Sequence, residues 1–167
     1  WSTSESLQRL KTEKMDIRVF DNVLENSLLE FIREELNILT WVTHRSQKEE
    51  SKINLFFSST EENLFTHQFL FNLICKKYNL SNKLSRSYVN CHPPHSFGNF
   101  HQDDADVTFL FYPDENEKDK GGTEFKDVTK VDYKTNRLII FDARIWHKAN
   151  INLSNEMRHS IAWKTLK

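Results

Sequence analysis

The sequence predicts an α+β protein whose strands form an antiparallel double sheet or a barrel. Helical patterns occur only in the first half of the chain, up to about residue 78. After residue 83 the pattern changes to short β-rich runs separated by turn-forming stretches. Helices followed by many short strands are typical of α+β proteins with antiparallel sheets. The length of 167 residues makes one domain the default expectation.

Composition and charge exclude several classes of protein. The chain is 38% hydrophobic and 13% aromatic, a globular profile that a disordered chain would not show. Its 23 basic and 24 acidic side chains nearly cancel, so no basic excess is available to hold a nucleic acid, and we expect none as a partner. No apolar run approaches the length of a transmembrane helix, so we expect no membrane association.

Cysteine and glycine are scarce, and both facts bear on function. Cys75 and Cys91 form neither a disulfide framework nor a Cys-x-x-Cys redox pair, so we expect two reduced thiols in a cytoplasmic protein. The three glycines, Gly98, Gly121 and Gly122, make no phosphate-binding loop. Their placement argues against the common nucleotide-binding folds.

The N-terminal part is expected to begin with a polar arm, residues 1–14, followed by a single domain over residues 15–167. Residues 17–20 alternate between apolar and polar side chains like a strand. Asn26 or Ser27 can then cap a helix. The expected apolar face of this helix carries Leu28, Phe31, Ile32 and Leu36.

Two strands and a second helix are expected next. The strands are placed at 40–45 and 53–58, with a polar loop at 46–52 between them. The second helix is expected to run from about residue 61 to 78. Its expected buried side carries Phe65, Phe69, Leu70, Leu73 and Ile74.

The remaining half of the chain is expected to supply the sheets. The predicted strands are 84–91, 97–101, 107–112, 123–126, 129–133, 137–142 and 157–164. Turn-forming residues separate them, among them the pair Pro93-Pro94. The aromatic residues Trp146 and Trp163 are assigned either to the core or to the wall of a substrate site.

Chemistry is first indicated by the run His101-Gln102-Asp103. Side chains two apart on a strand point to the same face, roughly 7 Å apart. An imidazole nitrogen and a carboxylate oxygen placed in this way can converge on one metal ion. His147 supplies a third ligand just past the end of the apolar strand 137–142. Two histidines and one carboxylate on one face of a metal are typical of non-haem iron(II) oxygenases, which need the remaining positions for a chelating cosubstrate and O₂.

An anion-binding pair is expected on the last strand. Arg158 and Ser160 share one face of that strand. A guanidinium matches a carboxylate through two parallel hydrogen bonds, and the neighbouring hydroxyl adds a donor. A dicarboxylate that chelates the metal with one end would present its other end to this pair.

The ordered set of motifs resembles the 2-oxoglutarate- and Fe(II)-dependent dioxygenases, in particular the prolyl-4-hydroxylase-like branch. The matching pieces begin with Tyr88-Val89-Asn90, His101-Gln102-Asp103 and Thr108-Phe109-Leu110-Phe111-Tyr112. They continue with Gly121-Gly122-Thr123-Glu124-Phe125, Asn136-Arg137-Leu138-Ile139-Ile140-Phe141, His147 and Arg158-His159-Ser160-Ile161-Ala162-Trp163-Lys164. The resemblance implies a double-stranded β-helix, or jelly roll, supported by N-terminal helices.

The resemblance also implies catalytic roles. His101, Asp103 and His147 would hold Fe(II), with 2-oxoglutarate and O₂ as cosubstrates and L-ascorbate as an accompanying reductant. Related halogenases lack the carboxylate ligand, so Asp103 favours hydroxylation of a C–H bond.

The cosubstrate would be held by four further side chains. In the resembling enzymes, residues at the positions of Arg158 and Tyr112 bind the distal carboxylate of 2-oxoglutarate. Tyr88 would line the cosubstrate from the preceding strand, and Ser160 would stand beside Arg158.

The sequence leaves more than one substrate and more than one reaction class open. The first choice of substrate is a prolyl residue in a protein or peptide, and the second is a free amino acid or another small molecule. A non-catalytic metal-binding jelly roll and a Zn²⁺-dependent hydrolase could use the same three ligands. Neither alternative requires an arginine and a tyrosine arranged for a second carboxylate.

Overall fold

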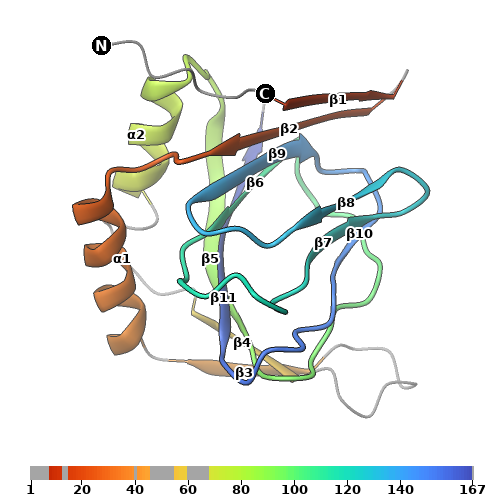
Figure 1. Ribbon diagram of the computed structural model, residues 1–167. Helices are drawn as coiled ribbons and strands as arrows, with labels where there is room; N and C mark the ends of the chain where they lie inside the picture. Colours follow the sequence, from red (N-terminus) through yellow and green to blue (C-terminus); the bar gives the residue numbers. More distant parts are fainter. Residues whose placement is uncertain (1–7, 13–14, 40, 46–54, 60–67, 167) are drawn as a thin grey trace.

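The computed structural model describes the chain apart from residues 1–7, 13–14, 40, 46–54, 60–67 and 167 (Figure 1). In chain order the elements are β1 (Gln8–Thr12), β2 (Met15–Asp21), α1 (Asn26–Ile38), β3 (Val42–Arg45), β4 (Leu55–Ser59), α2 (Leu70–Lys77), β5 (Lys83–His92), β6 (Val107–Tyr112), β7 (Gly122–Phe125), β8 (Thr129–Asp132), β9 (Arg137–Asp142), β10 (His147–Ala149) and β11 (Arg158–Leu166). Neither described helix is long and apolar enough to cross a membrane.

The strands form two antiparallel sheets. The large sheet has eight strands in the order β1-β2-β9-β6-β11-β5-β4-β3, and the small sheet has three in the order β10-β7-β8. Strand β11 lies in the middle of the large sheet and pairs with β5 on one side and β6 on the other. Side chains alternate between the two faces of a strand, so β11 contributes to two different environments.

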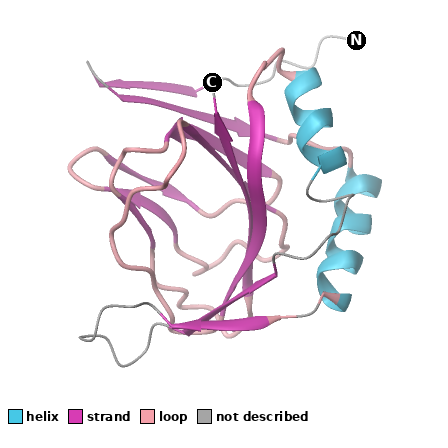
Figure 2. Cartoon of the chain, turned by 180° about the vertical axis from the view of Figure 1, so that it is seen from behind, coloured by secondary structure: helices cyan, strands magenta, loops and turns pink. Residues whose placement is uncertain are grey.

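One face of the large sheet is covered by the two helices (Figure 2). Phe109, Phe111 and Trp163 point to this face and pack against buried residues of α1 and α2. The ring centroids of Phe71 in α2 and Phe109 lie 5.4 Å apart in an edge-on arrangement. The apolar side of each helix is therefore buried against the sheet, as its amphipathic sequence requires.

The opposite face of the large sheet packs against the small sheet. Phe125 of β7 contacts Phe141 of β9, with ring centroids 4.9 Å apart. Ile17, Ile139 and Val131 belong to the same buried cluster, and so does Tyr112.

The predicted strand 97–101 does not form, apart from one isolated bridge between His101 and His147. The segment does run beside β10, because Gly98 N donates to Ala149 O at 2.9 Å. The carbonyl of Asn99 lies 2.9 Å from the ring nitrogen Nδ1 of His101. The partner strand β10 was not predicted, because three residues give too short a pattern.

Several details of the N-terminal half also differ from expectation. Glu25, and neither Asn26 nor Ser27, holds the N-cap position of α1, and it makes no side-chain capping bond. Phe31 of α1 and Phe69, the N-cap residue of α2, were expected to be buried, but both are exposed. Residues 8–12, within the predicted arm, pair with β2 as strand β1. The predicted loop 46–52, the start of the second helix and Phe65 lie outside the described residues.

Candidate metal centre

Two backbone hydrogen bonds bring the two histidines of the site together. His101 N donates to His147 O at 3.0 Å, and His147 N donates to His101 O at 2.9 Å. This reciprocal pair places the imidazole ring centroids 4.4 Å apart. The loop that follows is fixed in the same way, because Asp103 N donates to Ala143 O at 2.9 Å. The backbone therefore sets the position of all three candidate ligands.

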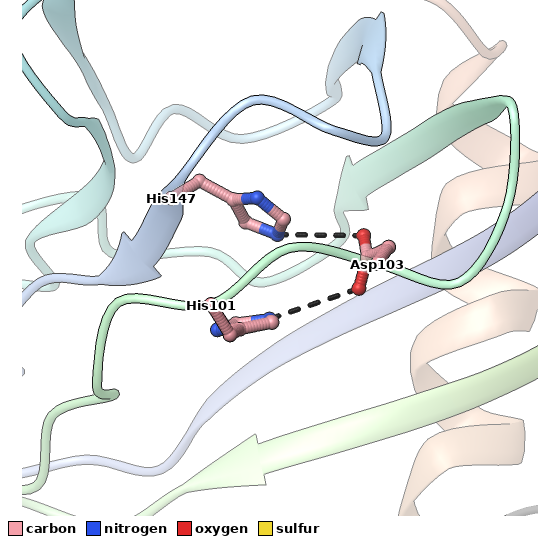
Figure 3. A group of neighbouring side chains, drawn as sticks. All are labelled: His101, Asp103 and His147. Carbon is pink, nitrogen blue, oxygen red and sulfur yellow. Dashed lines mark ion pairs between the residues drawn. The ribbon is translucent and has the colours of Figure 1, made fainter.

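The three side chains converge on one point (Figure 3). One ligand atom from each of His101, Asp103 and His147 lies within 4.8 Å of the others. Nε2 of His101 is 3.7 Å from Oδ1 of Asp103, and Nε2 of His147 is 3.4 Å from Oδ2. These are the three side chains that the sequence singled out as a possible metal site.

The outer nitrogens of both rings are occupied by backbone carbonyls. Nδ1 of His101 lies 2.9 Å from Asn99 O, and Nδ1 of His147 lies 2.8 Å from Ile145 O. A carbonyl oxygen can only accept a hydrogen bond, so each Nδ1 carries the proton. Each Nε2 faces the carboxylate. Such carbonyl contacts typically orient histidines that bind a metal.

Burial and charge keep Asp103 anionic. Burial by itself would raise the pKa of Asp103, but its interactions with His147 and Lys164 outweigh this effect and hold the pKa well below its usual value. Burial is the main cause that lowers the pKa of His101. The set thus offers two imidazole rings and one carboxylate, which suits a divalent transition metal.

The three candidate ligands differ in their exposure to solvent. The side chain of His101 is 54% exposed, whereas the side chains of Asp103 and His147 are buried. Trp146, next to His147, is also exposed, so it belongs to the surface near the site. Trp163 is fully buried on the helix-covered face of the large sheet and cannot reach this surface. Of the two tryptophans, only Trp146 remains a candidate for contact with a substrate.

The sequence did not indicate two polar residues that hold the carboxylate. Lys164 of β11 contacts Oδ2 of Asp103 through its ammonium group, and Thr108 of β6 donates to the same oxygen at 2.6 Å. Lys164 is only 2% exposed. The alternation along β11 was a usable signal, because a lysine at an inward-facing position of a buried strand requires a partner.

A second polar group lies farther along the same interior face. Arg158 is 3% exposed, and its Nη1 donates to Lys120 O at 2.7 Å and to Asn150 O at 2.8 Å. Among the described residues, no carboxylate forms an ion pair with Arg158. The two carbonyls use only part of the hydrogen-bonding capacity of the guanidinium and do not neutralise its charge. A buried cation without an anion is unfavourable.

The other predicted site residues surround this arginine or lie between it and Asp103. Ser160 and Ala162 follow Arg158 on the same face of β11, and Tyr88 is the cross-strand neighbour of Ala162. The ammonium of Lys164 lies 5.5 Å from the ring centroid of Tyr88, which places Tyr88 toward the metal end. All four side chains predicted to hold a cosubstrate, including Tyr112, therefore point into the interior or line it.

Tyr112 is fixed in its place by its hydroxyl group and its ring. Its hydroxyl oxygen is 2.6 Å from the hydroxyl oxygen of Thr123, and its ring stacks on Tyr133 with centroids 4.3 Å apart. Burial raises the pKa of Tyr112 to about 12, so the hydroxyl stays protonated. It is thus a neutral hydroxyl group that is hydrogen-bonded to Thr123.

An ion-pair network on the neighbouring loop supports the Arg158 region. Asp114 accepts from His159 N at 2.7 Å and lies 2.8 Å from His159 Nδ1. Lys120, also buried, lies 3.3 Å from the same carboxylate. Because the carbonyl of Lys120 binds Arg158, this network holds the acceptor of the arginine in position.

Neither a known family model nor a curated protein matches the sequence. Solved structures do match the fold. HygX from Streptomyces hygroscopicus, crystallised with nickel, 2-oxoglutarate and hygromycin B, superimposes with a TM-score of 0.67 at 12% identity, over 88% of this chain and 81% of that one. An oxidoreductase of the 2OG-Fe(II) oxygenase family from Burkholderia pseudomallei gives 0.68 at 10% identity, over 89% and 84%.

A peptide-modifying enzyme is also similar. A prolyl hydroxylase from Trichoplax adhaerens, in complex with a hypoxia inducible factor peptide, gives a TM-score of 0.64 at 18% identity, over 89% of this chain and 82% of that one. The resemblance to 2-oxoglutarate- and Fe(II)-dependent oxygenases is therefore confirmed at the level of the fold. The two antiparallel sheets agree with the jelly roll that the motifs imply.

Proposed function

We propose that the chain is a 2-oxoglutarate- and Fe(II)-dependent dioxygenase that hydroxylates a C–H bond. The observation that carries the proposal is the pairing of two groups in one interior. Three metal-ligating side chains converge at one end, and a buried arginine without a carboxylate partner among the described residues lies toward the other. A dicarboxylate that chelates a metal fits both groups at once.

The donor set fits a ferrous ion. His101, Asp103 and His147 would hold it through two imidazole nitrogens and one carboxylate oxygen. When bound, the metal would supply the activation of O₂, coupled to the conversion of 2-oxoglutarate to succinate and CO₂ while the substrate gains one oxygen atom. Zinc-dependent hydrolysis and metal binding without catalysis give no role to Arg158, and neither would produce succinate from 2-oxoglutarate.

The protein's own residues would bind and orient the cosubstrate. Arg158 would hold its distal carboxylate through a charge-assisted hydrogen bond, and Tyr112 and Ser160 would add neutral donors. Tyr88 would cover the cosubstrate from β5. The buried aromatic rings of Phe125 and Phe141 lie beside His147, with ring centroids 6.2 Å and 4.7 Å from its imidazole, so the wall of the metal end is apolar.

The substrate we propose first is a prolyl residue in a protein or peptide. The motif resemblance and one structural neighbour, the prolyl hydroxylase, support it. Proline in an extended peptide loses little conformational entropy on binding. The exposed Trp146 beside His147 offers an aromatic surface for its ring. A small molecule is the alternative, supported by the neighbour crystallised with hygromycin B.

The test is succinate production from 2-oxoglutarate with Fe(II) and O₂. We expect succinate to form with the wild-type protein and not with Asp103→Ala. Proline-containing peptides, free amino acids and small-molecule acceptors are then added in parallel, and products are examined for the mass of one added oxygen. Absence of succinate with every acceptor would refute the dioxygenase proposal. Coupled turnover with a small molecule and with no peptide would replace the prolyl substrate.

A further inference from the structure

The two oxygens of Asp103 lie in different surroundings. Oδ2 contacts the ammonium of Lys164 and accepts from Thr108 Oγ1 at 2.6 Å, while Lys164 Nζ also lies 3.3 Å from that hydroxyl. Oδ1 has neither donor and faces Nε2 of His101 at 3.7 Å. Oδ2 also lies 3.4 Å from Nε2 of His147. One oxygen is thus engaged by two donors from different strands, and the other is contacted by neither of them.

The ammonium is enclosed together with the carboxylate. The side chains of Lys164 and Asp103 are 3% and 5% exposed. Beside Asp103, the groups that face the ammonium are Thr108 of β6, the ring of Tyr88 and the cation of Arg86, its cross-strand neighbour. The one negative charge of the ligand set is therefore balanced by a fixed positive charge within the site.

We propose that Lys164 and Thr108 are positioning residues that make Asp103 a one-oxygen ligand, and that the charge of Lys164 makes metal binding depend on 2-oxoglutarate. With Oδ2 held, only Oδ1 is left for the metal, so three positions stay open for the cosubstrate and O₂. With the ligand charge balanced, a divalent ion keeps its full charge in a poorly solvated site. A dianion such as 2-oxoglutarate relieves this charge, so the two ligands should bind cooperatively.

The cooperative part of this inference rests on the proposed function, whereas the effect on the metal alone does not. Removal of the ammonium should let Asp103 use both oxygens and should also abolish a repulsion. Both changes tighten the binding of the metal alone. A lysine that only joined β11 to the 101–106 loop would give the opposite result, because its loss would disorder Asp103 and weaken the site.

The test is calorimetric titration of MnCl₂ into metal-free protein, with and without 2-oxoglutarate. We expect Lys164→Met to bind Mn²⁺ alone about tenfold more tightly than the wild type, given the strength of charge interactions in a poorly solvated site. We also expect 2-oxoglutarate to raise the Mn²⁺ affinity of Lys164→Met by a smaller factor than it raises that of the wild type. Lys164→Arg, which keeps the charge and a donor, should retain the wild-type pattern. Lys134→Met, which breaks a lysine–aspartate pair outside the site, should change neither value.

A second readout reports the coordination directly. The visible spectrum of the Co²⁺-loaded protein depends on the number of ligand atoms, and Lys164→Met should alter it while Lys134→Met should not. If Lys164→Met does not fold, as judged by its thermal melting, Thr108→Val removes the other donor and should shift Mn²⁺ affinity in the same direction by a smaller factor. Mn²⁺ affinity that is unchanged or weaker in these variants overturns the proposal.

The failure of this inference is distinguishable from failure of the proposed function. A wild-type protein that makes no succinate and gains no Mn²⁺ affinity from 2-oxoglutarate would refute the dioxygenase, and with it the cooperative part. The effect of Lys164 on Mn²⁺ alone would still be measured and would decide the positioning role.

Discussion

Trp163 and Lys164 are adjacent in β11 and lie on opposite faces of the large sheet. The indole of Trp163 packs among Phe71, Phe109 and the other residues beneath the helices, whereas the ammonium of Lys164 contacts Asp103 in the interior between the sheets. One strand therefore serves both the stability of the protein and its candidate chemistry. Substitutions at the two positions should separate these two properties.

Trp163→Ala should destabilise the fold without altering the metal site directly. Loss of a fully buried indole typically lowers the free energy of unfolding by about 3–5 kcal/mol. Denaturant titration measures this, and Trp163→Phe should lose less. If Trp163→Ala kept its stability but lost substrate turnover, the assignment of this side chain to the core would be wrong.

Asp103→Ala should weaken Mn²⁺ binding more than about 100-fold, because loss of a direct ligand exceeds the 10–100-fold effect typical of its supporting residues. Turnover should be lost as well, since the site loses both a ligand atom and its negative charge. The control is Asp104→Ala, which removes the exposed neighbouring carboxylate. Equal Mn²⁺ affinity in the Asp103 variant and the wild type would show that the three side chains do not form a metal site.

Arg158→Ala should raise the apparent KM for 2-oxoglutarate, because a desolvated charge loses its partner, at a cost of about 2–5 kcal/mol. Tyr112→Phe should have a smaller effect, about 0.5–1.5 kcal/mol for one hydrogen bond. Steady-state succinate production at varied 2-oxoglutarate concentrations measures both. Arg33→Ala, which removes an arginine on α1 paired with Glu115, serves as the control. An unchanged KM in the Arg158 variant would mean that another cation binds the cosubstrate.

Stability should fall as the pH rises from about 6.5 to 9. Burial tends to lower the pKa of His159, but its hydrogen bond to Asp114 outweighs burial and raises the pKa from its usual 6.5 to about 9. Protonated His159 therefore stabilises the fold fully at a pH below its pKa in the unfolded chain. This contribution is lost as the pH rises through its pKa in the folded protein. The loss should be on the order of 2–3 kcal/mol. Thermal melting across this range measures it, and His159→Gln should flatten the dependence.

The candidate metal ligands His101, Asp103 and His147 could be predicted from residue type and order along the chain, although the strand expected to align His101 with Asp103 does not form. Arg158 and Ser160 were also predicted, because they share one face of β11. Lys164 was not, although it is on the same face, because its partner Asp103 lies in an irregular loop whose course no pattern indicates. The exposure of Phe31 and Phe69 also escaped prediction, since only tertiary packing decides which flank of an apolar helix face is covered.

The reciprocal backbone bond between His101 and His147 has a consequence for how the metal enters and leaves. Bringing the two histidines together closes a long chain segment and costs conformational entropy. Main-chain hydrogen bonds of the folded protein offset this cost, so the metal is not needed for it. The empty protein is then already organised to receive an ion, and a chelator should strip the metal without unfolding the chain. Exchange between competing cations would follow their concentrations in solution, and no refolding step would limit its rate.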